Sequence, residues 1–157
     1  MSDNEFEAKD NNADASLGQP VEANSMAKGS HIICKGRPCK IEDISKSKPG
    51  KHGSAKLNMK VTDIFTNKKY EMSMPSHDMV ISPTVKRDEY QLVDVEGDYI
   101  NLMMPNGDLR EVKVNDNNLL DRIGELFSGE TDVFVSVMSC NNEEMAVSAR
   151  PIDTTKR

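Results

Sequence analysis

Two small β-barrels with a single helix, an all-β fold, are predicted by the order and spacing of the apolar residues. Between residues 31 and 81, short apolar runs alternate with turn signals, and no run has the length and period of a helix. After Pro83-Thr84 the pattern gives three extended runs, one helical run and two more extended runs. The first pattern is typical of an SH3-like barrel, and the second is the order of an OB-fold barrel with one helix.

The chain is expected to begin with a segment that does not fold. Residues 1–27 combine Asp, Asn, Glu, Ala and Ser without a periodic apolar face. Such a composition buries too little apolar surface to offset the entropy lost on ordering. We therefore predict a disordered acidic tail at residues 1–27, an SH3-like barrel at residues 28–83 and an OB-fold domain at residues 84–157.

The first barrel is expected to consist of short strands. The turn signal Lys35-Gly36-Arg37-Pro38 separates two apolar runs, which indicates a hairpin. Further along, Leu57, Met59 and Val61 alternate with polar residues, which is the period of a half-buried strand. The expected strands are residues 31–34, 39–44, 55–62, 70–74 and 79–81.

The second barrel is expected to contain one helix among its strands. Asn106-Gly107 is a strong hairpin signal. Asn115 to Asn118 supply candidate caps for the helix, and Gly129 is a stop signal after it. The apolar residues expected on the core face of this helix are Leu119, Leu120, Ile123, Leu126 and Phe127. The expected strands are residues 90–94, 99–104, 109–114, 133–137 and 145–149.

Charge is segregated along the chain. Residues 1–27 hold one Lys against six acidic residues, residues 28–87 hold thirteen Lys and Arg against five, and residues 88–157 hold six against fifteen. The net charges are therefore −5, +8 and −9, which sum to the overall −6. A block at +8 fits an electrostatic footprint for RNA, whereas a block at −9 is poorly suited to phosphates.

Composition also excludes several classes of protein. The three cysteines form no Cys-x-x-Cys pair, so neither a disulfide framework nor a zinc site is indicated. No apolar run approaches the roughly 20 residues that span a bilayer, and the acidic N-terminus is unlike a secretory signal. We expect a cytoplasmic protein with no membrane partner. Paired carboxylates, a nucleophile with its base and a metal cluster are absent at useful spacing, so we do not expect an enzyme.

The polar stretch between Ser45 and Ser54 carries the candidate site, and we predict a protruding loop there. Pro49 fixes its own φ, and Gly50 and Gly53 permit backbone turns that other residues avoid. The tip then presents one long cation outward. The predicted site consists of Lys51 at this tip and the flanking residues Lys46, Lys48, Pro49, Gly50, His52, Gly53 and Lys56.

Other chemistries for this loop fit less well. A phosphate-binding P-loop would need glycine where Ser45 stands and a hydroxyl where His52 stands. A catalytic lysine would need a desolvated pocket, which so polar a loop does not offer Lys51. A solvated surface hairpin with ordinary lysines is the remaining alternative, and it leads to a generic β-barrel RNA-binding protein without lysine modification.

Several runs resemble a known family, eukaryotic and archaeal translation initiation factor 5A. The resemblance covers about residues 25–152 and implies an SH3-like barrel followed by an OB-fold. The runs are Lys35-Gly36-Arg37-Pro38-Cys39-Lys40, Lys48-Pro49-Gly50-Lys51-His52-Gly53-Ser54-Ala55-Lys56, Asp63-Ile64-Phe65-Thr66, Lys68-Lys69-Tyr70, Lys86-Arg87 and Tyr90-Gln91-Leu92.

The resemblance implies a function for the loop. In that family the tip lysine, which Lys51 matches, receives an aminobutyl group from spermidine and is then hydroxylated to hypusine. Deoxyhypusine synthase and deoxyhypusine hydroxylase are the implied modifying partners, and no separate cofactor is implied. The modified factor would bind the ribosome near the exit site and reach toward the peptidyl-tRNA during elongation and termination, relieving stalled peptide-bond formation such as at proline runs. Pro49 and Ser54 replace the Thr and His usual in eukaryotic members, a departure that bears on the hydroxylation step.

Overall fold

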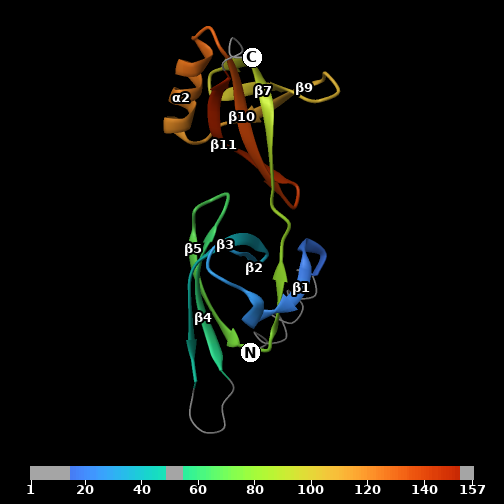
Figure 1. Ribbon diagram of the computed structural model, residues 1–157, viewed down its shortest axis with the longest axis vertical. Helices are drawn as coiled ribbons and strands as arrows, with labels where there is room; N and C mark the ends of the chain where they lie inside the picture. Colours follow the sequence, from blue (N-terminus) through green and yellow to red (C-terminus); the bar gives the residue numbers. More distant parts are fainter. Residues whose placement is uncertain (1–14, 49–54, 153–157) are drawn as a thin grey trace. The chain divides into compact units, whose positions relative to one another are not determined.

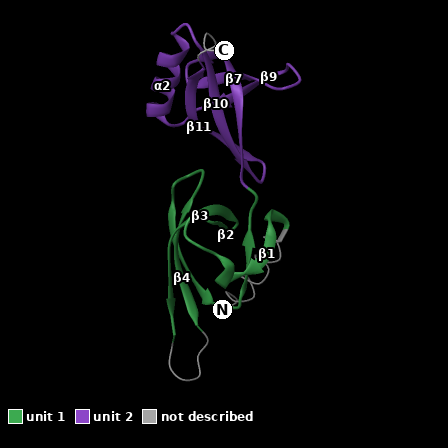
Figure 2. Cartoon of the chain, in the orientation of Figure 1, with its two compact units in different colours: residues 1–84 green, residues 85–157 purple. Residues whose placement is uncertain are grey.

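The computed structural model describes residues 15–48 and 55–152, and the chain divides into two compact units between Thr84 and Val85 (Figure 2). Most of the described residues lie in strands, with one α-helix among them, in the second unit (Figure 1). None of these residues forms a helix long and apolar enough to cross a membrane. The all-β architecture with one helix is confirmed, and the units meet one residue after the predicted boundary.

Unit 1 contains a four-stranded sheet and a two-stranded ribbon. Their strands are β1 (Gln19–Glu22), β2 (His31–Cys34), β3 (Arg37–Ser47), β4 (Lys56–Asp63), β5 (Lys69–Pro75) and β6 (Met79–Ser82). The sheet has the antiparallel order β2-β3-β4-β5, and the ribbon pairs β1 with β6. Because β6 also contacts β2, the ribbon lies beside the sheet.

The alternation along β4 explains how unit 1 forms its core. Leu57, Met59 and Val61 are buried, and the intervening Asn58 and Lys60 are exposed, as the period of 2 predicts. Residues of β2, β3 and β5 and one residue before β2 complete the same cluster. Its buried members are Ala23, Ile32, Cys34, Cys39, Ile41, Leu57, Met59, Val61 and Met74.

The prediction of a disordered tail over residues 1–27 is wrong for residues 15–27, which are ordered in unit 1. The 3₁₀ turns η1 (Ala15–Leu17) and η2 (Ala23–Ser25) flank β1, whose four residues pair with β6 from Gln19↔Ser82 to Glu22↔Met79. Ala23 is 0% exposed in the core of unit 1. Backbone pairing and this one buried methyl group order a segment whose composition alone would not fold. We call residues 18–25 the N-terminal strap. Residues 1–14 lie outside the described residues.

The predicted loop over residues 45–54 is also shorter than expected. Ser45 to Ser47 extend β3, where Ser45 pairs with Asn58 and Ser47 with Lys56. Polar residues can occupy this strand because the ladder uses only backbone groups, while the partner strand supplies the buried Leu57.

Unit 2 is a five-stranded antiparallel sheet with one helix. Its strands are β7 (Lys86–Glu96), β8 (Tyr99–Met103), β9 (Leu109–Lys113), β10 (Asp132–Cys140) and β11 (Glu143–Ile152). The order is β11-β10-β7-β8-β9, and the two edge strands β9 and β11 contact each other, so the sheet curls toward a closed barrel. The predicted sequence of three strands, a helix and two strands is confirmed.

Helix α2 (Asn117–Phe127) begins at a side-chain cap and packs on the barrel. The Asp116 carboxylate accepts hydrogen bonds from the backbone N–H groups of Asn118 and Leu119, which satisfies two otherwise unpaired donors. Ile123 is 0% exposed and belongs to the buried core of unit 2, and the helix contacts β7, β10 and β11. Phe127, predicted on the core face, is 40% exposed, so the apolar pattern extends one residue beyond the buried contact.

Two glycines give opposite predictions for stability. A Cβ on Gly18 of the N-terminal strap would lie 2.3 Å from the carbonyl oxygen of Ser82. Gly18→Ala must therefore displace backbone, and we expect it to lower the free energy of unfolding by about 1–3 kcal/mol. A Cβ on Gly124 of α2 would meet nothing within 4 Å. We expect Gly124→Ala to raise stability by about 0.5–1 kcal/mol, because alanine is the better helix former. Urea denaturation of both variants measures these two changes in the free energy of unfolding. A Gly18→Ala variant as stable as the wild type would contradict the close packing of the strap.

Candidate functional site

The two strands that enter the candidate loop lie side by side up to its base. Lys51 and its neighbours Pro49, Gly50, His52 and Gly53 lie outside the described residues. The described flanks end at Lys48 and resume at Ala55, and the last residue pair of the hairpin is Ser47↔Lys56. Ser47 Oγ also donates a hydrogen bond of 3.5 Å to the carbonyl of Lys56. The hairpin thus brings the two ends of residues 48–55 together.

Exposed cations flank this base on both faces of the hairpin. Lys46, Lys48 and Lys56 are all exposed. Lys46 pairs with the buried Leu57, whereas Lys56 pairs with the exposed Ser47. Because paired residues share a face and successive residues alternate, Lys46 and Lys56 point to opposite faces. The loop base therefore presents positive charge on both sides.

A groove of about 470 Å³ on the β3, β4 and β5 side of unit 1 is a second feature, which sequence reasoning missed. Two lysines and two glutamates line it, so its charges offset each other, and it does not resemble a simple phosphate site. One lining residue, Glu42, lies at the β-bulge in β3 between Ile41 and Asp43, which the sequence does not signal. The lining residues are Glu42, Lys60, Val61, Thr62, Lys69, Tyr70 and Glu71.

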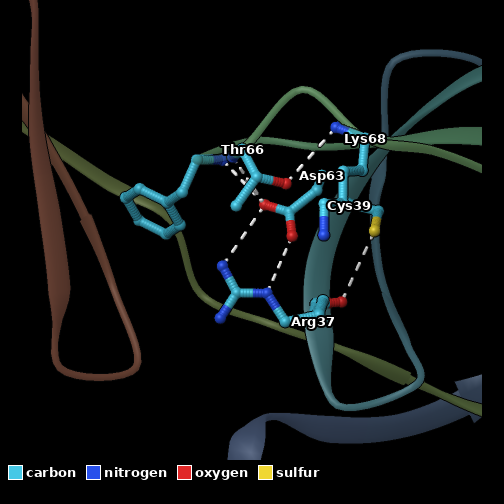
Figure 3. Close-up of polar contacts among 6 residues, drawn as sticks. Arg37, Cys39, Asp63, Thr66 and Lys68 are labelled. Atoms are coloured by element: carbon cyan, nitrogen blue, oxygen red, sulfur yellow. Dashed lines mark hydrogen bonds and ion pairs between the residues drawn. The ribbon is translucent and has the colours of Figure 1, made fainter. Parts of the chain in front are cut away.

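The opposite end of the β3–β4 hairpin is held by a partly buried ion pair between Arg37 and Asp63 (Figure 3). Asp63 is 1% exposed, and its Oδ2 accepts a hydrogen bond of 2.7 Å from Nε of Arg37. Its Oδ1 accepts hydrogen bonds from the backbone N–H groups of Phe65 at 2.8 Å and Thr66 at 3.1 Å. The same oxygen accepts a longer side-chain hydrogen bond of 3.4 Å from Nη2 of Arg37. One carboxylate therefore joins the start of β3, the end of β4 and the turn that follows.

These contacts decide the charge of Asp63. Burial by itself raises the pKa of this carboxyl group, because it penalises the charged form. The hydrogen bonds from Arg37, Phe65 and Thr66 and the charge of Arg37 outweigh burial and lower the pKa to about 2. Both residues lie in the family-like runs of the sequence, but no local pattern indicates that they form a pair.

Cys39 does not offer a reactive thiol beside the ion pair of Arg37 and Asp63. Cys34, Cys39 and Cys140 are all buried. Burial, followed by the neighbouring Cys34 and Asp63, raises the pKa of the Cys39 thiol to about 12. A thiol with so high a pKa stays protonated near neutral pH and is a poor nucleophile or metal ligand.

Unit 2 offers a limited surface for stacking on bases. Tyr99 is 39% exposed, and the ammonium of Lys113 lies 6.0 Å from the centre of its ring. Lys113 also lies 3.8 Å from a carboxylate oxygen of Asp98. In a segment with a net charge of −9, this cation is already near an acidic partner. Such a surface is unlike the basic, aromatic grooves that hold single strands.

Comparison with known proteins identifies both units. A family model described as translation initiation factor 5A-like, N-terminal, matches residues 16–78. A second, described as eukaryotic elongation factor 5A hypusine, DNA-binding OB fold, matches residues 84–150. The chain is 44% identical over 140 residues to eukaryotic translation initiation factor 5A-2 of Schizosaccharomyces pombe, covering 88% of this chain and 82% of that protein. It is 40% identical over 149 residues to eukaryotic translation initiation factor 5A-2 of Saccharomyces cerevisiae, covering 94% and 95%.

Solved structures agree with this result. A translation initiation factor eIF-5A family protein from Naegleria fowleri matches with a TM-score of 0.77 and 35% identity, over 85% of this chain and 99% of that one. Eukaryotic translation initiation factor 5A from Methanococcus jannaschii matches with a TM-score of 0.68 over 85% and 97%. At 23% identity this second likeness supports the fold alone.

The fold and these matches together define a class of protein. A curled β unit followed by an OB-fold unit is the architecture of a two-barrel translation factor. The predicted SH3-like barrel followed by an OB-fold barrel is thereby confirmed. This chain belongs to the translation initiation factor 5A family.

The depressed pKa of Asp63 predicts how stability depends on pH. Its value is about 2 in the folded protein, against 3.8 for an unperturbed group. A carboxylate with a lowered pKa stabilises the fold above the unfolded value, by about 2 kcal/mol here, and this contribution is lost as the pH falls from about 4 to about 2. Asp63→Asn should therefore destabilise the protein at pH 7 and flatten the pH dependence in that window.

Urea denaturation at a series of pH values measures this effect. Asp43→Asn, at an exposed position in β3 of the same hairpin, is the matched control and should behave like the wild type. If Asp63→Asn loses stability between pH 4 and pH 2 as steeply as the wild type, the proposed charge of Asp63 is wrong.

Proposed function

We propose that this protein is a ribosome-binding translation factor that acts through a hypusine formed on Lys51. The factor would assist elongation and termination by relieving stalled peptide-bond formation, such as at proline runs. The ribosome near its exit site and the peptidyl-tRNA would be its working partners. The family relationship, with a matching model whose description names hypusine, carries this proposal.

The geometry of the hairpin supports a reaching role for Lys51. The β3–β4 ladder continues to Ser47↔Lys56, so the loop starts from a paired, twisted strand base and not from a loose connection. Lys46, Lys48 and Lys56 around this base would attract RNA phosphates without reading sequence. Pro49, Gly50, His52 and Gly53 would shape the tip, as the sequence predicts.

The modification gives the side chain length and charge that lysine lacks. Deoxyhypusine synthase would transfer the aminobutyl group of spermidine to Lys51, and deoxyhypusine hydroxylase would complete hypusine. The product carries two separated amines, so it can meet phosphates beyond the reach of an ordinary lysine. Peptide-bond formation stays with the ribosome, and the factor itself catalyses no step; it favours the reactive geometry of the substrate. Such a factor would work in the cytoplasm.

The segregation of charge along the chain would divide this work. Residues 28–87 carry +8 and include the loop, whereas residues 88–157 carry −9. Residues 28–87 would therefore supply the phosphate contacts, and residues 88–157 would contribute little to RNA affinity by themselves. A generic β-barrel RNA-binding protein is the alternative, in which Lys51 stays unmodified and is equivalent to Lys48.

Substitution of Lys51 should separate function from folding. Lys51→Arg retains the positive charge but cannot accept the aminobutyl group, so we expect it to abolish stimulation of proline-run synthesis in a reconstituted translation assay. Its stability should stay within about 0.5 kcal/mol of the wild type, since the loop sequence has no apolar residue to bury. Translation rates and thermal melts of the same samples give both readouts.

Two control variants show the effects of losing a flanking charge and of losing the fold. Lys48→Ala removes one flanking cation and should reduce activity only partially. Leu57→Asp places a carboxylate at a position that is 4% exposed and should lose activity by unfolding the barrel. A Lys51→Arg variant that melts normally and supports wild-type synthesis would refute the proposed mechanism.

A further inference from the structure

The N-terminal strap is attached to the turn that connects β5 to β6. The turn spans Pro75 to Asp78 and is closed by a hydrogen bond of 3.1 Å from Asp78 N–H to the Pro75 carbonyl. The strap donates two backbone hydrogen bonds to it, from Ala23 to Asp78 at 2.8 Å and from Asn24 to Ser76 at 3.0 Å. With Ala23 fully buried, this end of the strap is fixed in unit 1.

Ser76 links this strap to the base of the lysine loop. Its carbonyl accepts the bond from Asn24, and its own N–H donates to the carbonyl of Ala55 at 2.9 Å. Ala55 is the first described residue after the loop tip, and the next residue, Lys56, pairs with both Ser47 and Pro75. Ser76 is 3% exposed, so water does not compete freely for these bonds.

The two flanks of the loop are therefore held by different means. The N-terminal flank is held by the pairing of Ser47 with Lys56. The C-terminal flank is held one residue closer to the tip, at Ala55, through Ser76 and the N-terminal strap. Without these backbone bonds Ala55 would belong to the loop, because it lies outside β4.

We propose that Ser76 and the N-terminal strap position the lysine loop by fixing the backbone of Ala55. The inference rests on the proposed function, because its consequence is the presentation of Lys51 to the modifying enzyme. A loop anchored nearer its tip samples fewer conformations, so less entropy is lost when the enzyme binds it. Asn24, Ser76 and Ala55 would act through their backbone groups, as positioning residues.

Proline substitutions cut this connection on each side of Ser76. Asn24→Pro removes the N–H that donates to Ser76, at an exposed residue of the strap. Ser76→Pro removes the N–H that donates to Ala55, at the second position of a turn, where proline is favoured. The matched controls Asn24→Ala and Ser76→Ala keep both N–H groups and lose only the side chains.

The first readout is independent of modification. Unmodified full-length protein made in a bacterial host is treated with trypsin under native conditions, and the rate of cleavage after Lys51 is measured. Losing one net hydrogen bond should raise this rate about threefold to tenfold in the proline variants relative to their alanine controls. Equal cleavage rates in a folded proline variant and its alanine control would overturn the proposal. If thermal melting shows that Ser76→Pro does not fold, the comparison of Asn24→Pro with Asn24→Ala is the test.

The second readout is the transfer of the aminobutyl group. With deoxyhypusine synthase and spermidine, kcat/KM for Lys51 should fall about threefold to tenfold in the proline variants and stay at the wild-type value in the alanine controls. If cleavage accelerates but transfer does not slow, the strap holds the flank without positioning Lys51, and that part of the inference fails. If the wild-type protein accepts no aminobutyl group at all, the proposed function fails, while the trypsin result still decides whether the strap fixes Ala55.

Discussion

The buried carboxylate of Asp63 fixes the end of the hairpin on which the functional loop is built. It accepts hydrogen bonds from Arg37 at the start of β3 and from Phe65 and Thr66 in the turn after β4. A slip of one residue between β3 and β4 would move every side chain to the other face and expose Leu57, Met59 and Val61. The ion pair therefore helps to define the register that ends at Ser47↔Lys56, where the lysine loop begins.

The loop base depends on backbone pairing more than on side-chain packing. Near the tip the residues of β3 are serine and lysine, which contribute little to a core, so the ladder and the buried residues of β4 must hold them. The Asn24, Ser76 and Ala55 connection extends this support beyond the end of β4. Such an arrangement fixes both flanks of the loop and leaves the exposed Lys46, Lys48 and Lys56 around its base, where the proposed contact with RNA needs positive charge.

Much of this fold could be predicted from residue periodicity. The alternation in β4, the Asn106-Gly107 turn and the apolar face of α2 each identified the right element, because each depends on local pattern. The N-terminal strap could not be predicted in this way, since its order comes from pairing with β6, about 60 residues away, and from burial of the single residue Ala23. For the site, Lys46, Lys48 and Lys56 are exposed around the loop base as expected, whereas Lys51 and its neighbours stay predictions. The Arg37 and Asp63 pair joins residues that are distant in sequence, and the turn-forming tendency of Asp63 was its only local signal.

Peptide mass spectrometry of protein purified from its native host shows directly whether Lys51 carries hypusine. We expect an aminobutyl adduct, with or without the added hydroxyl, on Lys51 and on no other lysine. The flanking Lys46, Lys48 and Lys56 serve as internal controls, because they share the same basic environment. Native protein that is active in translation and carries an unmodified Lys51 would refute the proposed role of this residue.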